Sequence, residues 1–295
     1  MPAAICHYLH GERVWKVLQK RKPLLSSDAF FLGVQGPDIF YFHRALPWHK
    51  KKETSLRTWG DTFHQENPAK LFQTLRQQYE QNRAPILEAY LYGFLCHYSL
   101  DRTTHPLIQY GAATLHQLHP EKPELFLHHQ IESVLDTILL RYERGALPTE
   151  FPLKQVVPMN EAVWEEVSRF YQRVIAALFQ KEISQDALLE MLQDSRKVLG
   201  VLYDRTTLKQ TFLARRERRK GKYQISCYFR SISEEEDYDY ANVCEQEWQW
   251  PLAAGQARRE TFFDLYERSV QEAQELIEAY FQTQDFATFT KQIPF

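Results

Sequence analysis

Cysteine is scarce in this sequence of 295 residues, and the four cysteines that occur are widely spaced. No two of them form a C-x-x-C pair, which argues against a structural zinc knuckle and against a disulfide framework. The N-terminus carries His7, Glu12 and Arg13 where a signal peptide would need an unbroken apolar core. We therefore expect a protein of a reducing compartment, in the cytoplasm.

The sequence also lacks long apolar runs and an excess of charge of either sign. No segment reaches about 18 uninterrupted apolar residues, so we expect no transmembrane segment. The formal net charge is -2, which gives no support to a nucleic-acid partner over the whole surface. Hydrophobic residues make up 44% and charged residues 25%, as in a globular protein with a sizeable core.

Histidine is absent from residues 130–295, because all 11 histidines lie between His7 and His129. A random scatter would confine them in this way only about once in ten thousand sequences. Histidine is the commonest metal ligand and the usual acid–base group near neutral pH. We therefore expect residues 1–145 to form a metal-binding helical half. Residues 146–295 should form a second helical half, packed into the same domain.

Helical periodicity dominates the sequence and predicts an all-α, multi-helix bundle. Proline and glycine should interrupt it at Leu24–His43, at Pro106 and in the connector ALPTEFPLKQVVP. The segment YQISCYF has strand-like content, between a basic run and an acidic run. The expected helices cover about 2–20, 58–65, 68–81, 85–101, 106–116, 124–140, 161–179, 185–199, 206–218 and 259–280.

Two histidine–carboxylate pairs carry the strongest chemical signal. His97 and Asp101 stand four residues apart on an apolar helix, as do His128 and Glu132 on the next one. Residues four apart project from one helix face. About 1.4 such pairs are expected by chance, so the number of pairs alone decides little. Their apolar surroundings favour metal ligands over a hydrogen-bonded core pair, because unpaired polar groups are costly there.

Further candidates surround these pairs in the sequence. His105 follows Asp101 by four residues and is either a ligand or a helix-end cap. Asp38 is presented from a constrained Gly-Pro turn, and His64 and His7 lie on predicted helices. His129 points about 100° away from His128, so only one of the two should share a face with Glu132. Asp136 is expected to support a ligand, and the loop residue His49 to be solvated. Three more histidines are expected at the surface: His43, His116 and His119.

Other catalytic templates do not fit this sequence. It has no His-Asp dipeptide, no E-x-x-H, no H-E-x-x-H, no phosphate-binding G-x-x-x-x-G-K and no G-x-S-x-G. What remains is a set of histidines and carboxylates without thiolates, spread over several helices. Such ligands suit zinc, and also iron or manganese.

These segments resemble the zinc-dependent phospholipase C family, whose superfamily includes secreted single-strand nucleases. The resemblance rests on MPAAICHYLHGE, LGVQGPDIFYF, the Phe63–His64 pair, GFLCHYSLDRTTHP and HHQIESVLD. The tail, with DYANVCEQEWQWPL and FFDLYERSVQEA, is similar to the intracellular bacterial branch. The resemblance therefore extends over nearly the whole chain.

The resemblance implies a helical bundle that holds two or three zinc ions and hydrolyses phosphate esters. Asp38 would be both a ligand and the catalytic base. The implied metal ligands are His7, Asp38, His64, His97, Asp101, His105, His128 and Glu132. Two features of this chain differ from the family pattern, and they concern the second and third of the implied zinc sites. The chain lacks the N-terminal tryptophan of the secreted enzymes, and His105 follows Asp101 by four residues where the phospholipase has six.

The expected function is metal-dependent hydrolysis of a small phosphoester or a phospholipid-like substrate. One alternative is a non-catalytic helical protein whose metal only stabilises the bundle. Another is a metal hydrolase that acts on a different ester or amide. Choline phospholipid, single-stranded nucleic acid and a small phosphomonoester all remain open as substrates, and the sequence does not indicate an oligomeric state.

Overall fold

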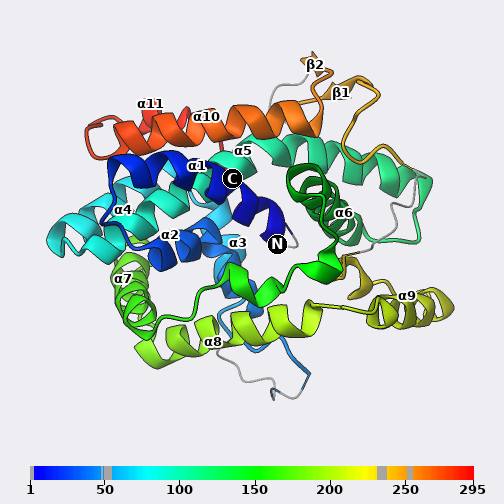
Figure 1. Ribbon diagram of the computed structural model, residues 1–295, viewed down its shortest axis with the longest axis horizontal. Coiled ribbons are helices and arrows are strands. Elements are labelled where there is room, and N and C mark those ends of the chain that lie inside the picture. The colour runs from blue at the N-terminus through cyan, green and yellow to red at the C-terminus, as the bar shows by residue number, and fades with distance from the viewer. Residues whose placement is uncertain (1–2, 48, 50–54, 231–237, 251–254) are drawn as a thin grey trace. The chain divides into compact units, whose positions relative to one another are not determined.

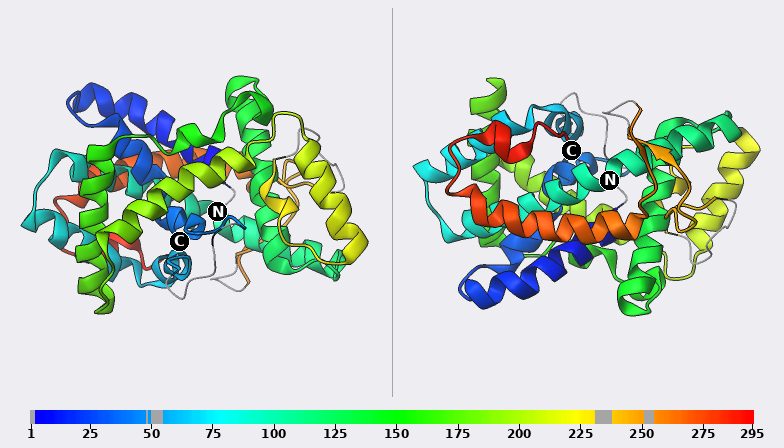
Figure 2. Two further views of the ribbon diagram at one scale, coloured as in Figure 1. Left: turned by 90° about the horizontal axis from the view of Figure 1, so that it is seen from below. Right: turned by 90° about the horizontal axis from the view of Figure 1, so that it is seen from above.

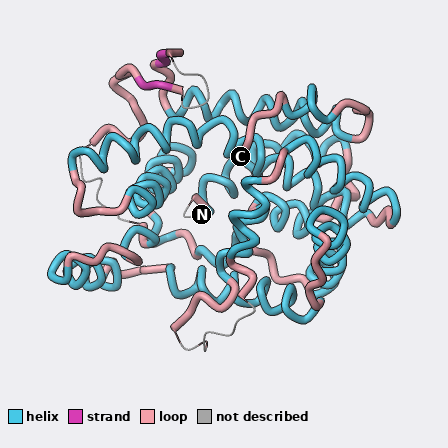
Figure 3. The backbone as a smooth tube through the Cα atoms, turned by 180° about the vertical axis from the view of Figure 1, so that it is seen from behind, coloured by secondary structure: helices cyan, strands magenta, loops and turns pink. Residues whose placement is uncertain are grey.

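The computed structural model describes residues 3–47, 49, 55–230, 238–250 and 255–295 (Figure 1). Helices dominate these residues, and the strands form one short antiparallel pair (Figure 3). The all-α expectation is confirmed. The helices are α1 (Ala4–Arg21), α2 (Ser27–Val34), η1 (Gly36–Phe42), α3 (Thr58–Gln65), α4 (Pro68–Gln81), α5 (Pro85–Leu118), α6 (Glu124–Arg144), η2 (Pro148–Glu150), η3 (Leu153–Val156), α7 (Glu161–Phe179), α8 (Gln185–Leu202), α9 (Leu208–Lys220), η4 (Ser226–Tyr228), α10 (Phe262–Tyr280) and α11 (Phe286–Thr290), where η marks a 3-10 helix. The strands are β1 (Trp248–Gln249) and β2 (Ala257–Arg258).

The chain divides into two compact units, which are described separately. The first unit comprises residues 1–9, 103–153 and 200–269, and the second comprises residues 10–102, 154–199 and 270–295. The boundaries fall inside α1, α5, α8 and α10, so each of these helices begins in one unit and ends in the other. The expected division of the chain near residue 145 remains a prediction.

The helices begin and end where their terminal residues supply caps. The Ser26 side chain accepts a hydrogen bond from the Ala29 N–H at the start of α2, and Asn67 caps α4 in the same way. Pro68 occupies the first turn of α4, where a missing N–H costs nothing. Gly145 ends α6 in the left-handed conformation, with a φ of 62°. These caps satisfy terminal backbone groups that a helix leaves without partners.

In the second unit, α2 and α5 cross at two glycines. A Cβ placed on Gly33 would lie 2.1 Å from the carbonyl oxygen of Tyr90, and one on Gly93 would lie 2.0 Å from that of Phe30. Only glycine leaves room for this contact between backbones. The crossing brings the start of η1, which carries Asp38, beside the middle of α5.

The chain's last helices also pack in the second unit. Figure 2 shows α11 in red beside α4 in cyan, and the two helices are in contact. The Tyr280 hydroxyl, at the end of α10, donates a hydrogen bond to the Phe72 carbonyl at 3.0 Å. The Arg76 guanidinium donates to the carbonyls of Tyr280 and Thr283 at 3.0 and 2.6 Å. These contacts fix the path of the chain into its last residues.

The first unit is built around α6. The Ser133 hydroxyl donates to the Cys227 carbonyl at 2.5 Å, which joins α6 to η4. The Asp136 carboxylate accepts two hydrogen bonds from the Arg230 guanidinium, at 2.6 and 2.8 Å, and one from the Cys6 backbone N–H at 2.7 Å. Burial of the Cys6 thiol, together with the neighbouring Asp136 carboxylate, raises its pKa well above the usual value.

The predicted break at Pro106 is wrong, because α5 continues through it to Leu118. Proline removes one backbone hydrogen bond inside the helix. However, Thr103, Thr104, Leu107 and Ile108 are all buried around it, and this packing offsets the loss.

Three other local predictions also differ from the structure. The stretch Leu24–His43 forms α2 and η1 rather than a loop, and YQISCYF contains η4 rather than a strand. The short helix α11 and the strand pair had no sequence signal. Most of the acidic run after residue 230 lies outside the described residues.

Among the described residues, no helix is long and apolar enough to cross a membrane.

Candidate metal centre

Helix α5 supplies two side chains of the first candidate centre, which lies in the second unit. His97 is fully buried, and its Nε2 lies 3.1 Å from Oδ2 of Asp101, one turn further along the helix. Gly36, with a φ of +50°, provides the space for the imidazole, since a Cβ there would lie 2.3 Å from Cδ2 of His97. The left-handed backbone and the closeness of the ring both require glycine at this position.

His64 reaches the same place from α3. Its Nδ1–H donates a hydrogen bond to the Gly60 carbonyl at 2.7 Å, so Nε2 carries the lone pair that a metal needs. This Nε2 lies 3.4 Å from Oδ1 of Asp38 and 3.6 Å from Oδ2 of Asp101. Burial lowers the pKa of His64, but the two nearby carboxylates outweigh it and raise the pKa above its usual value.

Four side chains from three elements therefore converge in the second unit. One ligand atom each from His64, His97 and Asp101 lies within 4.8 Å of the others, and Asp38 approaches from η1. All four side chains are buried or nearly so, with exposed fractions of 16% or less. Two imidazoles and two carboxylates in apolar surroundings form a donor set that suits zinc.

A second candidate centre lies in the first unit. Ligand atoms of His105, His128 and Glu132 lie within 4.8 Å of one another. The Glu132 carboxylate lies 3.4 Å from Nε2 of His128 and 3.6 Å from Nε2 of His105. Burial raises the pKa of Glu132, but nearby positive charge, including that of His128, holds it well below the usual range. A carboxylate that stays ionised while buried is suited to a cation.

The expectation that only one of His128 and His129 faces Glu132 is wrong. His129 Nδ1 lies 3.1 Å from the second carboxylate oxygen of Glu132, whereas the first oxygen faces both His105 and His128. His129 also packs against the Tyr228 ring, with ring centroids 5.1 Å apart. Asp136, expected to support a ligand, is instead held by Arg230 and the Cys6 backbone.

A third group, formed by His43, Glu190 and Asp194, has metal-like spacing but the wrong protonation for a metal. The Leu56 N–H donates to Nδ1 of His43 at 2.8 Å, so neutral His43 carries its proton on Nε2, the atom that faces Glu190. A metal at Nε2 would require an imidazolate. Glu190 is also bound by the Arg44 guanidinium, which lowers its pKa to about 2. His43 was expected at the surface, but it is fully buried and acts as a structural residue.

His7 is also buried, with an exposed fraction of 2%, and it lies in the part of α1 that belongs to the first unit. Its role as a metal ligand remains a prediction. The His119 side chain is partly exposed, at 45%, and His116 donates from Nδ1 to the Lys122 carbonyl. Of the aromatic residues near Asp38, Phe40 and Phe42 are core residues, whereas Tyr41 is partly exposed.

Sequence reasoning missed two residues around the first centre, Asp61 and Phe295. The Tyr41 ring stacks against His64 at 6.0 Å, and its hydroxyl donates to Asp61 at 2.7 Å. Phe295 packs against the imidazoles of both His64 and His97. The Gly-Pro signal before Asp38 indicated a constrained turn, but no local pattern pointed to the last residue of the chain.

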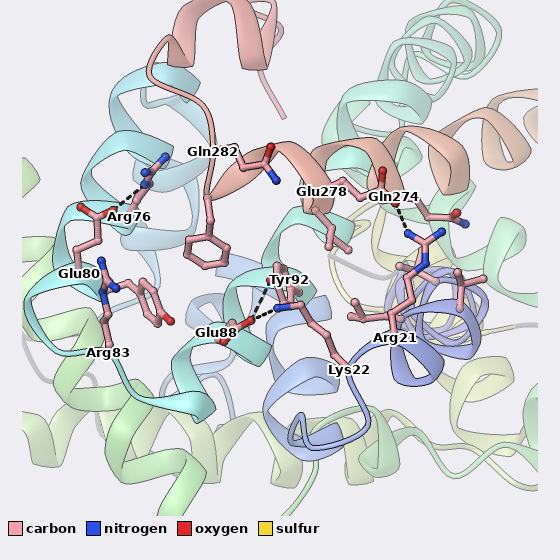
Figure 4. Close-up of a pocket in the computed structure, with 16 residues that line it drawn as sticks. Arg21, Lys22, Arg76, Glu80, Arg83, Glu88, Tyr92, Gln274, Glu278 and Gln282 are labelled. Atoms are coloured by element: carbon pink, nitrogen blue, oxygen red, sulfur yellow. Dashed lines mark hydrogen bonds and ion pairs between the residues drawn. The ribbon is translucent and has the colours of Figure 1, made fainter.

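A cavity of about 700 Å³ in the second unit is separate from these centres (Figure 4). No described residue that lines it is a histidine, cysteine or aspartate. Its charged groups pair across the opening, with Arg21 bound to Glu278, and Lys22 bound to Glu88 at 2.5 Å. The cavity therefore contains none of the proposed zinc ligands.

Comparison with known proteins identifies the class to which this chain belongs. The sequence model of the family described as zinc dependent phospholipase C matches residues 6–192, more than half of the chain. The chain therefore belongs to the zinc-dependent phospholipase C family. No curated protein and no solved structure gives a significant match. The matched range contains every predicted metal ligand, and the family implies a zinc-dependent hydrolase of phosphoester bonds.

Proposed function

We propose that this protein is a zinc-dependent phosphoester hydrolase. The observation that carries the proposal is the convergence of Asp38, His64, His97 and Asp101 in one buried place. Membership of the family supports it, since the family is zinc dependent. Iron and manganese accept the same donors, so the metal is to be identified by analysis of the purified protein.

The donor groups fit a zinc ion in chemistry as well as in spacing. The Gly60 carbonyl holds His64 in the tautomer whose Nε2 faces the carboxylates. Gly36 leaves the space in which His97 lies against the turn. When bound at these residues, zinc would polarise a phosphoryl oxygen and lower the pKa of a water molecule towards 7.

Asp38 is proposed as the catalytic base. Its carboxylate lies at the start of η1, 3.4 Å from Nε2 of His64, with an exposed fraction of 7% for the whole residue. It would orient the attacking water and accept its proton on a carboxylate oxygen. The attack would be in line on phosphorus, with the ester oxygen as the leaving group.

We propose His105, His128 and Glu132 as the ligands of another zinc ion. Their spacing and the ionised state of the buried Glu132 support this assignment. His7 is proposed as a further ligand, by its position in the family resemblance. The substrate class proposed is a small phosphoester or a phospholipid-like molecule, and a cytoplasmic location is part of the same proposal.

The proposal is tested by metal analysis of the purified protein together with a panel of phosphodiesters and phosphomonoesters. We expect at least two equivalents of metal in the wild type. The variant His97→Ala should lose metal and turnover, since a buried ligand is removed. His119→Ala is the matched control, because this histidine is partly exposed, belongs to none of the candidate metal groups and should change neither quantity.

The outcomes separate the alternatives. Full metal content in His97→Ala would show that the ligand assignment is wrong. Metal bound by the wild type without turnover of any ester in the panel would instead indicate a structural metal.

A further inference from the structure

Phe295, the last residue of the sequence, lies against the first candidate centre. Its ring centroid is 5.2 Å from that of His64 and 5.9 Å from that of His97, with interplanar angles of 69° and 45°. It also packs edge-on against Tyr98 at 4.8 Å. Only 8% of Phe295 is exposed. A single aromatic ring therefore contacts both imidazoles that are proposed to bind zinc.

The segment that carries Phe295 is held by α5, the helix that also supplies His97. The Tyr98 hydroxyl donates to the Ile293 carbonyl at 2.5 Å and lies 3.2 Å from the Thr290 carbonyl. The Arg102 guanidinium lies over the Tyr98 ring, 5.0 Å from its centroid. The tail and the ligand are thus fixed to adjacent residues of one helix, so the position of the Phe295 ring is coupled to that of His97.

We propose that Phe295 is a positioning residue of the metal centre, and that residues 291–295 complete that centre. The ring would hold the His64 and His97 imidazoles in the orientation that zinc requires and close one side of the centre to water. Groups that surround a ligand change metal affinity by about 10- to 100-fold when they are removed. This inference rests on the proposed function, and it concerns a segment outside the range matched by the family, residues 6–192.

The test compares Phe295→Ala and Phe295→Leu with Phe286→Ala. Phe286 is a matched control because it is almost equally buried, at 9% exposed, and its ring contacts Tyr280 and Phe289 instead of the histidines. Zinc affinity is measured by competition with a chelating dye, and stability by urea unfolding of the metal-free protein. We expect Phe295→Ala to bind zinc at least tenfold more weakly and Phe295→Leu to recover part of the loss. Phe286→Ala should be destabilised but should keep the wild-type affinity.

Two results would overturn the inference. One is an unchanged zinc affinity in Phe295→Ala. If turnover also rises in this variant, the ring only blocks access to the centre. The other is an equal loss of affinity in Phe286→Ala, which would assign the effect to general stability. Zinc binding by the wild type without ester turnover would reject the proposed function but not this inference. A wild type that binds no zinc would reject both.

Discussion

Replacing Gly36 with alanine should displace a proposed zinc ligand without removing any ligand atom. The new Cβ would lie 2.3 Å from Cδ2 and 2.7 Å from Nε2 of His97. Ordinary van der Waals contact begins at 3.4 Å, so the imidazole must move by roughly 1 Å. Zinc–nitrogen distances vary by only about 0.2 Å around their normal value, so His97 could not remain a ligand in its present place.

The same substitution also strains the backbone, and this effect needs its own control. Gly36 has a φ of +50°, and an L-residue in this region costs about 1–2 kcal/mol. Gly145 has a φ of +62°, and a Cβ added there would meet no atom within 4 Å, so Gly145→Ala carries the strain alone. The difference between the two variants therefore isolates the displacement of His97.

The assay is equilibrium zinc binding by dye competition, combined with urea unfolding of the metal-free proteins. Both variants should lose about 1–2 kcal/mol of unfolding free energy, and Gly36→Ala somewhat more because its ring contact is overpacked. Only Gly36→Ala should lose at least tenfold in zinc affinity, which corresponds to about 1.4 kcal/mol. If Gly36→Ala binds zinc as tightly as Gly145→Ala, the assignment of His97 as a ligand in this geometry is refuted.

Three further predictions follow from the described contacts. Arg230→Met should cost about 3–5 kcal/mol of unfolding free energy in denaturant titrations, because it leaves the fully buried Asp136 carboxylate without its ion pair; a loss below about 1 kcal/mol would show that the pair is unimportant. In the wild type, ionised Glu190 contributes stability that is fully present above pH 4.5 and is lost as the pH falls towards about 2. Arg44→Gln should abolish this contribution. Wild-type and variant unfolding free energies should therefore converge over that range, and a constant difference would contradict the ion pair. His43→Gln should leave the zinc content measured by metal analysis unchanged, whereas a loss of zinc would show that the tautomer argument is wrong.

The sequence predicted those parts of the fold and site that depend on local spacing. The helices near 161–179 and 185–199 follow from apolar periodicity, and the structure has them at nearly these bounds. The closeness of His97 to Asp101 and of His128 to Glu132 follows from the helical repeat itself. The family resemblance placed Asp38 and His64 in the ligand set, and the structure brings His64 to both Asp38 and Asp101.

The remaining features depend on contacts between distant parts of the chain. Pro106 predicts a break, but the buried residues on both sides of it keep the helix continuous. His43 precedes the segment RALPWHKKKE, which ends in a run of charges, yet the Leu56 backbone and Glu190 bury and orient it. Phe295 lies almost 200 residues after His97, so no periodic pattern could connect them.

The two glycines at which α2 and α5 cross set the spacing of the proposed ligands. Gly93 lies one helical turn before His97, and Gly33 lies five residues before Asp38. A methyl group added at either glycine would force the two backbones apart and increase the distance between Asp38 and His97. Zinc binding should therefore be sensitive to substitutions at residues that no metal ion would ever contact.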